Sequence, residues 1–185
     1  MRVIAGSAGG LKLLSPNGND TRPTADRVRE ALFSIIGDDI AGASFLDLFA
    51  GTGAVGIEAL SRGAGRAVFV DASPQCVEII NKNLAHTRLT DNARVTNADV
   101  CFALKKILND SFDIIYVDPP YGGGVTEAAL NDIILYKRLA DNGFIITEYG
   151  AGEVICKPDG LTIVKEKAYG RTRLILYLAR DPETG

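Results

Sequence analysis

The sequence has no tryptophan, only one histidine and only three cysteines among its 185 residues, and it has no long run of apolar residues. A helix needs about 20 apolar residues to cross a bilayer, so no membrane-spanning segment is predicted. The first residues, 1–6, are too short and too rich in glycine for a signal peptide. These absences predict a cytoplasmic protein that has no membrane partner.

The scarce cysteine and histidine side chains also limit the chemistry. Cys76, Cys101 and Cys156 lie far apart, are odd in number and form no Cys-x-x-Cys pair. Neither a disulfide framework nor a zinc site is therefore predicted, and we expect three buried thiols. The single histidine, His86, falls near the end of a predicted helix, which disfavours a Ser-His-Asp or Cys-His mechanism.

Charge is nearly balanced overall, at −3, but it is unevenly distributed. Residues 1–29 hold five Lys or Arg against two acids, for +3, and residues 157–180 hold six against two, for +4. The middle, residues 30–156, carries −8. If both ends fold onto one side, they form a modest positive surface suited to phosphate groups. The alternative is that these are scattered, solvated charges.

Hydrophobic residues make up 46% of the chain, enough for one compact domain with a substantial core. From Ser44 onward, short β-rich apolar runs alternate with helical patterns, which is typical of a doubly wound α/β domain. Right-handed crossovers then make the strands parallel. Strands are predicted at residues 44–48, 67–71, 94–97, 112–117 and 144–148, and helices at residues 54–62, 74–86, 101–108 and 127–139.

Both ends of the chain depart from this alternation. Residues 162–169 and 172–178 are β-rich and are separated only by Gly170 and Arg171, so they predict an antiparallel hairpin at the end of the sheet.

The first residues predict a small extension outside the main sheet. Apolar runs at residues 2–5 and 11–14 surround several glycines and predict a β-hairpin. Thr24 is predicted to be the N-cap of an amphipathic helix that ends at Gly37. The predicted organisation is therefore a hairpin extension at residues 1–24 and an α/β domain at residues 25–185.

A glycine-rich turn follows the first predicted strand. Gly51 and Gly53 begin a Gly-x-Gly-x-x-Gly pattern at a helix N-terminus, where backbone N–H groups can contact a ligand. Asp71, at the end of the next strand, can accept hydrogen bonds from ribose hydroxyls. A nicotinamide dinucleotide site meets the same description. Asp47, just before the turn, favours a cationic ligand such as S-adenosylmethionine, because a carboxylate lies unfavourably close to a pyrophosphate.

A proline-rich tetrapeptide, Asp118-Pro119-Pro120-Tyr121, follows the predicted strand at residues 112–117. Two prolines fix φ and remove two backbone donors, so the chain leaves the sheet as a stiff corner. The aspartate can accept hydrogen bonds from an exocyclic base amine, and the aromatic ring can stack on that base. An ordinary proline-rich turn with a solvated aspartate is the alternative.

Two of these patterns resemble Class I methyltransferases. Asp47-x-Phe49-x-Gly51-x-Gly53 is similar to their S-adenosylmethionine loop, and the tetrapeptide is similar to their amino-methylating motif. The resemblance implies their α/β fold, a doubly wound and mostly parallel sheet with a C-terminal antiparallel hairpin. It also implies that Asp99 contacts the cofactor's adenine. The other interpretation of Asp99, as the N-cap of the helix after it, is compatible with this role.

The rest of the chain resembles the RsmD family, which methylates N2 of one guanine, the guanine-966 type, in 16S ribosomal RNA. The resemblance rests on the Arg-Pro-Thr-x-Asp-Arg-Val-Arg-Glu pattern within residues 21–33 and on the Tyr-Gly-Arg-Thr of residues 169–172. It implies a monomer that acts on 16S RNA or on the assembling small subunit. The residues assigned to RNA contact are Arg2, Lys12, Arg22, Pro23, Thr24 and Arg27.

Two departures from the family pattern matter. The family commonly has Gly-Arg-Lys-Leu in the hairpin, whereas this chain has Leu11 in place of the arginine. Asp71 stands where a glutamate is common, and either carboxylate can reach a ribose. The first departure weakens the case for a strong hairpin contact with RNA.

Three other functions remain open from sequence. An N6-adenine or N4-cytosine methyltransferase shares the tetrapeptide. An NAD-dependent oxidoreductase shares the glycine pattern. A non-enzymatic RNA-binding module would leave Asp118 and Asp47 without a role.

Overall fold

The computed structural model describes residues 1–15, 23–120 and 124–180, apart from the side chains of residues 23–25. A seven-stranded sheet runs through the centre, in the order β3-β2-β1-β4-β5-β7-β6. The strands are β1 (Ser44–Leu48), β2 (Arg66–Asp71), β3 (Ala93–Asn97), β4 (Phe112–Val117), β5 (Leu139–Gly150), β6 (Leu161–Tyr169) and β7 (Thr172–Ala179).

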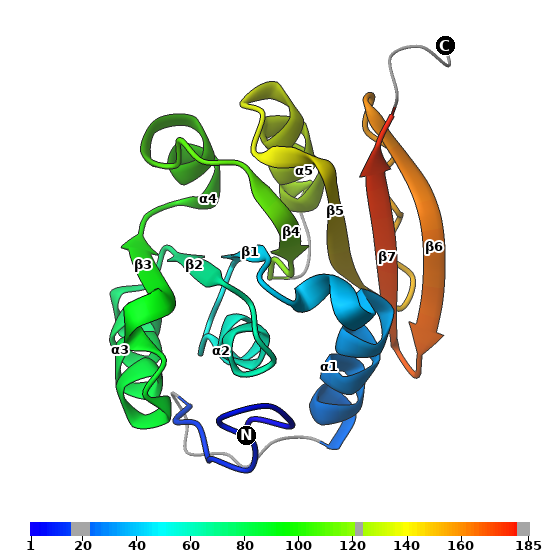
Figure 1. The fold of residues 1–185 in the computed structure, drawn as a ribbon. Helices are drawn as coiled ribbons and strands as arrows, with labels where there is room; N and C mark the ends of the chain where they lie inside the picture. The colour runs from blue at the N-terminus through cyan, green and yellow to red at the C-terminus, as the bar shows by residue number, and fades with distance from the viewer. Residues whose placement is uncertain (16–22, 121–123, 181–185) are drawn as a thin grey trace.

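The strand directions confirm the predicted fold class. Strands β1 to β5 pair in parallel, whereas β7 is antiparallel to both β5 and β6 (Figure 1). The chain moves outward from β1 through β2 to β3 and then returns to place β4 on the other side of β1. In open α/β sheets, ligands bind at such a reversal, beyond the carboxyl ends of the strands. The boundary between β1 and β4 is therefore where a site is expected.

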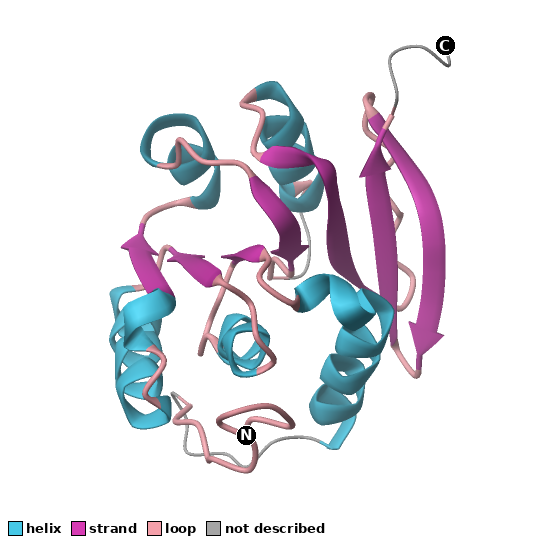
Figure 2. Ribbon diagram, in the orientation of Figure 1, coloured by secondary structure: helices cyan, strands magenta, loops and turns pink. Residues whose placement is uncertain are grey.

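Helices cover both faces of the sheet (Figure 2), with α1, α2 and α3 on one side and α4 and α5 on the other. A turn of 3-10 helix follows α1, a second precedes β3, and a π-helical turn at Ala103–Ile107 extends α4. The helices are α1 (Pro23–Ile36), α2 (Ala54–Ser61), α3 (Pro74–Thr87), α4 (Val100–Phe102) and α5 (Val125–Leu135).

Two hydrophobic cores follow from the alternation of side chains along the strands. Phe45 of β1 belongs to the core beneath α1, α2 and α3, whereas Leu46 and Leu48 belong to the core beneath α4 and α5. All three side chains are fully buried. Asp47 alternates with Leu46 and Leu48 and therefore projects on the α1 side of the sheet.

The N-terminal segment forms less strand structure than predicted. It lies outside the main sheet, as expected, but within residues 1–15 only Arg2 and Lys12 form an antiparallel bridge. The segment is instead attached to α2, where the Glu58 carboxylate accepts hydrogen bonds from the N–H groups of Ile4 at 2.7 Å and Ala5 at 3.0 Å. These bonds use backbone donors that a longer hairpin would need. The division at residue 24 remains a prediction.

Two predicted helix boundaries are wrong. Thr24 is not an N-cap, because α1 begins at Pro23, whose fixed φ suits the first helical position. Helix α5 ends at Leu135 and not at Leu139, because Lys137 adopts a left-handed conformation with φ 53°. Leu139 instead begins β5 and pairs with Phe112.

Three smaller expectations concern the cysteines, His86 and membrane-spanning helices. The three cysteines are free but only half-buried, so the expectation of buried thiols is wrong. His86 lies in the last turn of α3, as predicted. In the described ranges, no helix combines the length and the hydropathy that a membrane span requires.

Candidate active site

Three neighbouring strands place polar side chains together at their carboxyl ends. Asp47 of β1 lies opposite Tyr116 of β4 in the parallel register, and the Tyr116 hydroxyl donates a hydrogen bond to Glu148 Oε2 of β5 at 2.8 Å. Asp118 directly follows β4, two residues beyond Tyr116. The site therefore forms at the reversal of strand order between β1 and β4.

A cavity of about 260 Å³, here called the α1 cavity, lies between helix α1 and these strand ends. The charged side chains that line it, among the described residues, are three carboxylates and one guanidinium. The lining residues are Met1, Val28, Arg29, Leu32, Asp47, Phe49, Ala50, Gly51, Thr52, Ala54, Val55, Tyr116, Asp118 and Glu148.

The glycine-rich turn forms one wall of the α1 cavity. Phe49, Gly51 and Gly53 all adopt left-handed conformations, with φ of 63°, 57° and 74°. Glycine has this freedom at little cost, whereas Phe49 is strained, and such strain gathers at functional sites. Asp71 holds the turn, because its Oδ2 accepts a hydrogen bond from the Gly51 N–H at 2.8 Å and its Oδ1 accepts one from Ser73 at the same distance.

The carboxylate of Asp47 is almost completely buried, with 2% of the residue exposed. Its Oδ2 accepts a hydrogen bond from the Gly56 N–H at 2.9 Å. Burial raises the pKa of Asp47 from 3.8 to about 8; the Gly56 hydrogen bond lowers the pKa and the charge of Asp71 raises it. A bound cation would counter this shift.

The other two carboxylates of the α1 cavity, Asp118 and Glu148, also have raised pKa values. Burial raises the pKa of Asp118 well above its usual value, and the charges of Glu148, Asp47 and Glu153 raise it further. Burial also raises the pKa of Glu148. Shifts of this kind cluster at functional sites, and here they favour a ligand with positive charge.

Among the residues that the structure describes, Arg29 is the one cationic side chain that lines the α1 cavity. It is 5% exposed, and its Nη2 donates hydrogen bonds to the Arg2 carbonyl at 2.6 Å and to Asp26 at 3.0 Å. Its Nε forms no hydrogen bond within the described part of the chain and lies 3.9 Å from Oε2 of the fully buried Glu58. S-adenosylmethionine, with its ammonium, sulfonium and carboxylate, fits the charges of this cavity.

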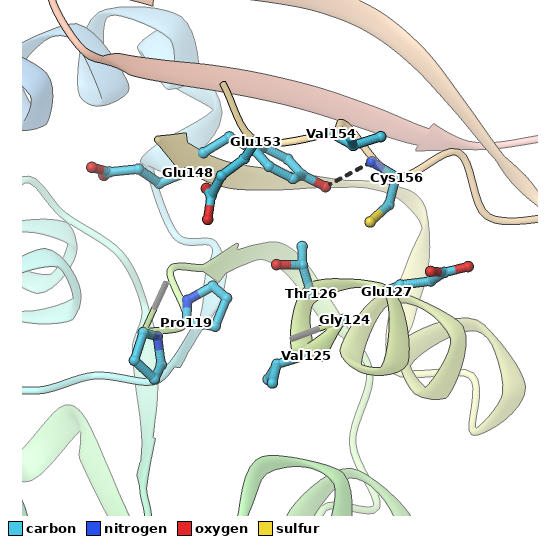
Figure 3. A pocket seen from close by; sticks show the side chains of 11 residues that line it. Pro119, Gly124, Val125, Thr126, Glu127, Glu148, Glu153, Val154 and Cys156 are labelled. Carbon is cyan, nitrogen blue, oxygen red and sulfur yellow. Dashed lines mark hydrogen bonds between the residues drawn. The ribbon is translucent and has the colours of Figure 1, made fainter. Parts of the chain in front are cut away.

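A second cavity of about 490 Å³, here called the proline cavity, lies beside the first. Figure 3 shows Glu148 and Glu153 on one side of it and Pro119, Val125 and Thr126 on the other. Glu148 lines both cavities, whereas Asp118 lines the first and the prolines that follow it line the second. The lining residues are Pro119, Pro120, Gly124, Val125, Thr126, Glu127, Glu148, Tyr149, Glu153, Val154 and Cys156.

Asp99 is a helix cap in the structure. It is exposed and accepts a hydrogen bond from the Phe102 N–H at 3.0 Å, which confirms the capping interpretation. Neither cavity includes Asp99 in its lining. Its contact with adenine stays a prediction.

The residues assigned to RNA are only partly described. Arg2 and Lys12 are exposed and paired with each other across the N-terminal bridge, and Arg27 is exposed on α1. Pro23 and Thr24 lie in the first turn of α1. Arg22 and Tyr121 lie outside the described residues.

Sequence reasoning missed three residues of the site, namely Arg29, Tyr116 and Glu148. Arg29 stands in an amphipathic helix, and nothing local distinguishes it from a surface arginine. Glu148 offers a usable signal, because it ends the apolar run of β5 at the same sheet edge as Asp118. Among the described residues, no group of histidine, cysteine and acidic side chains could hold a metal ion.

Comparisons with known proteins agree on the family. The family model described as "Conserved hypothetical protein 95" matches residues 1–178. A Bacillus subtilis relative, "Putative rRNA methyltransferase YlbH", is 38% identical over 183 residues, which cover 97% of this chain and 100% of that protein. "Ribosomal RNA small subunit methyltransferase D" of Escherichia coli strain K12 is 37% identical, over 96% of this chain and 89% of that one.

A solved structure agrees as well. "Putative methyltransferase yhhF from Escherichia coli" superposes with a TM-score of 0.86 at 34% identity, and the match covers 98% of both chains. Together with the matched family model and the relatives, this likeness shows that the chain belongs to the RsmD family of Class I methyltransferases, whose cofactor is S-adenosylmethionine.

Proposed function

We propose that this protein transfers a methyl group from S-adenosylmethionine to the exocyclic N2 amine of a guanine in 16S ribosomal RNA, at a guanine-966-type position. One observation carries the proposal: the corner after β4 places Asp118 in the α1 cavity and Pro119 and Pro120 in the adjoining proline cavity. A cofactor in the first cavity and a base in the second would meet at this corner. The names of the relatives support ribosomal RNA as the substrate.

The side chains of the corner would act on the amine nitrogen. When bound, S-adenosylmethionine supplies a methyl group on a sulfonium and leaves as S-adenosylhomocysteine, as the C–S bond breaks and an N–C bond forms. The Asp118 carboxylate and the Pro119 carbonyl accept hydrogen bonds from the two N–H groups, which localises the nitrogen lone pair. Asp118 then accepts the proton that the methylated nitrogen loses.

Cofactor binding is assigned to the α1 cavity. Asp47 faces the positive end of the cofactor, and Phe49 and Gly51 provide the wall. Gly53 and Asp71 are not part of the cavity lining; Gly53 is assigned to the same turn, and Asp71 is assigned to accept hydrogen bonds from the ribose. Asp99 is assigned to the adenine. The turn that Asp71 already holds lies at the N-terminus of α2, where backbone donors are available to a ligand.

RNA contact is assigned to the N-terminal segment and the start of α1. Arg2, Lys12 and Arg27 are exposed, and within the described ranges none of them forms an ion pair. RNA contact is also assigned to Arg22, Pro23 and Thr24, and Tyr121 is assigned to stack on the target base. Residues 1–24 then serve as an RNA-contacting extension of a monomeric methyltransferase domain, residues 25–185, that works in the cytoplasm.

Mapping of methyl groups tests the substrate. Ribosomal RNA from a strain that lacks the gene is compared with RNA from the same strain after the gene is restored. We expect one N2-methylguanine in 16S RNA that disappears with the gene and returns with it. A methyl group that returns on an adenine N6 or a cytosine N4 supports the alternative and rejects guanine N2.

A thermal-shift comparison tests the oxidoreductase alternative. An oxidoreductase would be stabilised by NADH and not by S-adenosylhomocysteine.

The Asp118→Ala variant tests the catalytic assignment. It removes the acceptor carboxylate, so we expect no measurable methyl transfer but nearly unchanged cofactor binding in titration calorimetry. Full activity of this variant would exclude Asp118 from catalysis. Asp91→Ala, an exposed aspartate at the opposite edge of the sheet, is the matched control and should retain activity.

A further inference from the structure

Glu148 is the one residue, within the described ranges, that lines both the α1 cavity and the proline cavity. A methyl group can pass from one cavity to the other only where they meet. The amine that receives it must therefore sit beside Glu148, and the base atoms on either side of that amine come within reach of the carboxylate.

The structure fixes the orientation of this carboxylate. The Tyr116 hydroxyl donates to Glu148 Oε2 at 2.8 Å, and Tyr116 is itself buried, with 4% of the residue exposed. A carboxylate has about four acceptor positions and no donor when ionised, so the hydroxyls of Tyr116 and Thr172, which both lower the pKa of Glu148, leave acceptor capacity for a ligand. Glu148 is thus a rigid acceptor next to the reacting nitrogen.

The three base amines differ in their neighbours. The N2 amine of guanine lies between N1–H, which is a hydrogen-bond donor, and N3, which is an acceptor. The N6 amine of adenine lies beside N1, and the N4 amine of cytosine lies beside N3, and both of these ring nitrogens are acceptors without a proton. A carboxylate on the N1 side of the N2 amine therefore attracts guanine, whereas a carboxylate beside N1 of adenine or N3 of cytosine is repelled.

We propose that the Glu148 carboxylate accepts a hydrogen bond from N1–H of the target guanine and thereby selects guanine among the bases that carry an exocyclic amine. This inference rests on the proposed function and deepens it, because the tetrapeptide of the corner does not distinguish these amines. Asp118 and the Pro119 carbonyl hold the two N2 protons, and Glu148 holds the adjacent ring proton.

Two other glutamates of the proline cavity do not meet these conditions. They are Glu153, whose Oε2 accepts a hydrogen bond from the Gly150 N–H at 2.6 Å, and Glu127, which is exposed in the first turn of α5. Neither lines the α1 cavity. The charge of the bound cofactor also stabilises the ionised form of Glu148 against the effect of its burial.

The test compares two RNA substrates that differ only at N1 and O6 of the target base. Once the methylated position is mapped, 16S RNA is assembled by ligation with either guanine or 2-aminopurine at that position. 2-Aminopurine keeps the N2 amine but has an unprotonated N1. Because a hydrogen bond to a charged group is lost, the wild-type protein should methylate the 2-aminopurine RNA at least about 10-fold more slowly, measured as kcat/KM.

The Glu148→Gln variant makes the test specific. Glutamine can donate its amide N–H to the unprotonated N1, so the preference for guanine should shrink to near one, and kcat/KM on guanine should fall about 10- to 100-fold. Tyr116→Phe keeps the charge of Glu148 and should keep the preference, with a smaller loss of rate. Glu78→Gln, an exposed glutamate on α3, removes one carboxylate elsewhere and should behave as wild type.

Three outcomes would overturn the proposed role of Glu148, and a fourth would contradict the proposed function. Equal rates of the wild-type protein on the two RNAs overturn the inference, whether or not the variants fold. An unchanged guanine preference in Glu148→Gln overturns it too, as does loss of cofactor binding in that variant by calorimetry, since Glu148 would then serve the cofactor. A wild-type protein that leaves guanine unmethylated contradicts the proposed function itself.

Discussion

The buried carboxylate of Asp47 accepts a hydrogen bond from the Gly56 N–H at 2.9 Å, which joins the end of β1 to the first turn of α2. Burial raises the pKa of this carboxyl to about 8, far above its ordinary value of 3.8. The ionised form of Asp47 is therefore unfavourable unless a cation lies beside it. The stability of the protein and its affinity for the cofactor should depend on pH in opposite directions.

Asp47→Asn should stabilise the ligand-free protein at high pH. The folded-state pKa of Asp47 lies above the unfolded value, so the folded protein binds a proton more tightly, and the free energy of unfolding falls as pH rises from about 4 to about 8. Asparagine does not titrate, so it lacks this pH dependence, and its side-chain oxygen can still accept the hydrogen bond from the Gly56 N–H. We expect a gain of several kcal/mol at pH 8.5 and little change at pH 4, measured by urea unfolding. An equal effect at both pH values would contradict the assigned pKa.

Cofactor affinity should increase with pH. The positive charges of S-adenosylmethionine favour the ionised form of Asp47, so a proton must leave when the cofactor binds below pH 8. Affinity should rise by up to about tenfold per pH unit between pH 6 and pH 8. Calorimetry in two buffers of different ionisation enthalpy measures the proton release. Asp47→Asn should bind more weakly at pH 8 and show a flatter profile.

Asp71→Ala should weaken cofactor binding for two reasons. The variant loses the carboxylate proposed to bind the ribose, and it releases the N–H groups of Gly51 and Ser73 that shape the turn. We expect a loss of about tenfold or more in affinity by titration calorimetry. Asp91→Ala, an exposed aspartate in the turn before β3, should bind the cofactor as wild type does. Wild-type affinity in Asp71→Ala would remove Asp71 from the site.

Glu58→Ala should detach the N-terminal segment. Glu58 is fully buried and accepts hydrogen bonds from Ile4, Ala5 and, at 2.6 Å, the Nε of Arg62. Its removal leaves buried donors unsatisfied, which costs about 3–5 kcal/mol in the free energy of unfolding. Hydrogen exchange should show the amides of Ile4 and Ala5 losing protection. Glu78→Ala, which breaks an exposed pair with Lys82, should have almost no effect.

Gly56→Ala tests the close packing of α2 on the sheet. A Cβ at this position would lie 2.3 Å from Cε1 of the Phe69 ring. Alanine improves helix propensity by about 1 kcal/mol, but the overlap should cost more, with a net loss of about 1–3 kcal/mol. Phe69→Leu should partly rescue the alanine variant in a double-mutant cycle of thermal unfolding. A stabilised single variant would show that the ring moves freely.

The sequence by itself determined the architecture and the two motifs of the site. The alternation of apolar residues sets the face on which each strand residue lies, and glycine or proline sets the local backbone, so the parallel α/β class and the places of Asp47 and Asp118 in the chain followed from local rules. Helix ends such as that of α5 were less predictable, because a left-handed Lys137 has no distinctive sequence signal.

Only the tertiary structure brought Arg29, Tyr116 and Glu148 together. They come from α1, β4 and β5, up to 119 positions apart in the chain, and each becomes a site residue only because parallel pairing aligns the strand ends beneath α1. Burial then decided their chemistry, since a carboxylate acquires a raised pKa only when other elements exclude water from it. Local backbone structure depends on neighbours in the sequence, whereas the electrostatics of this site depends on neighbours in space.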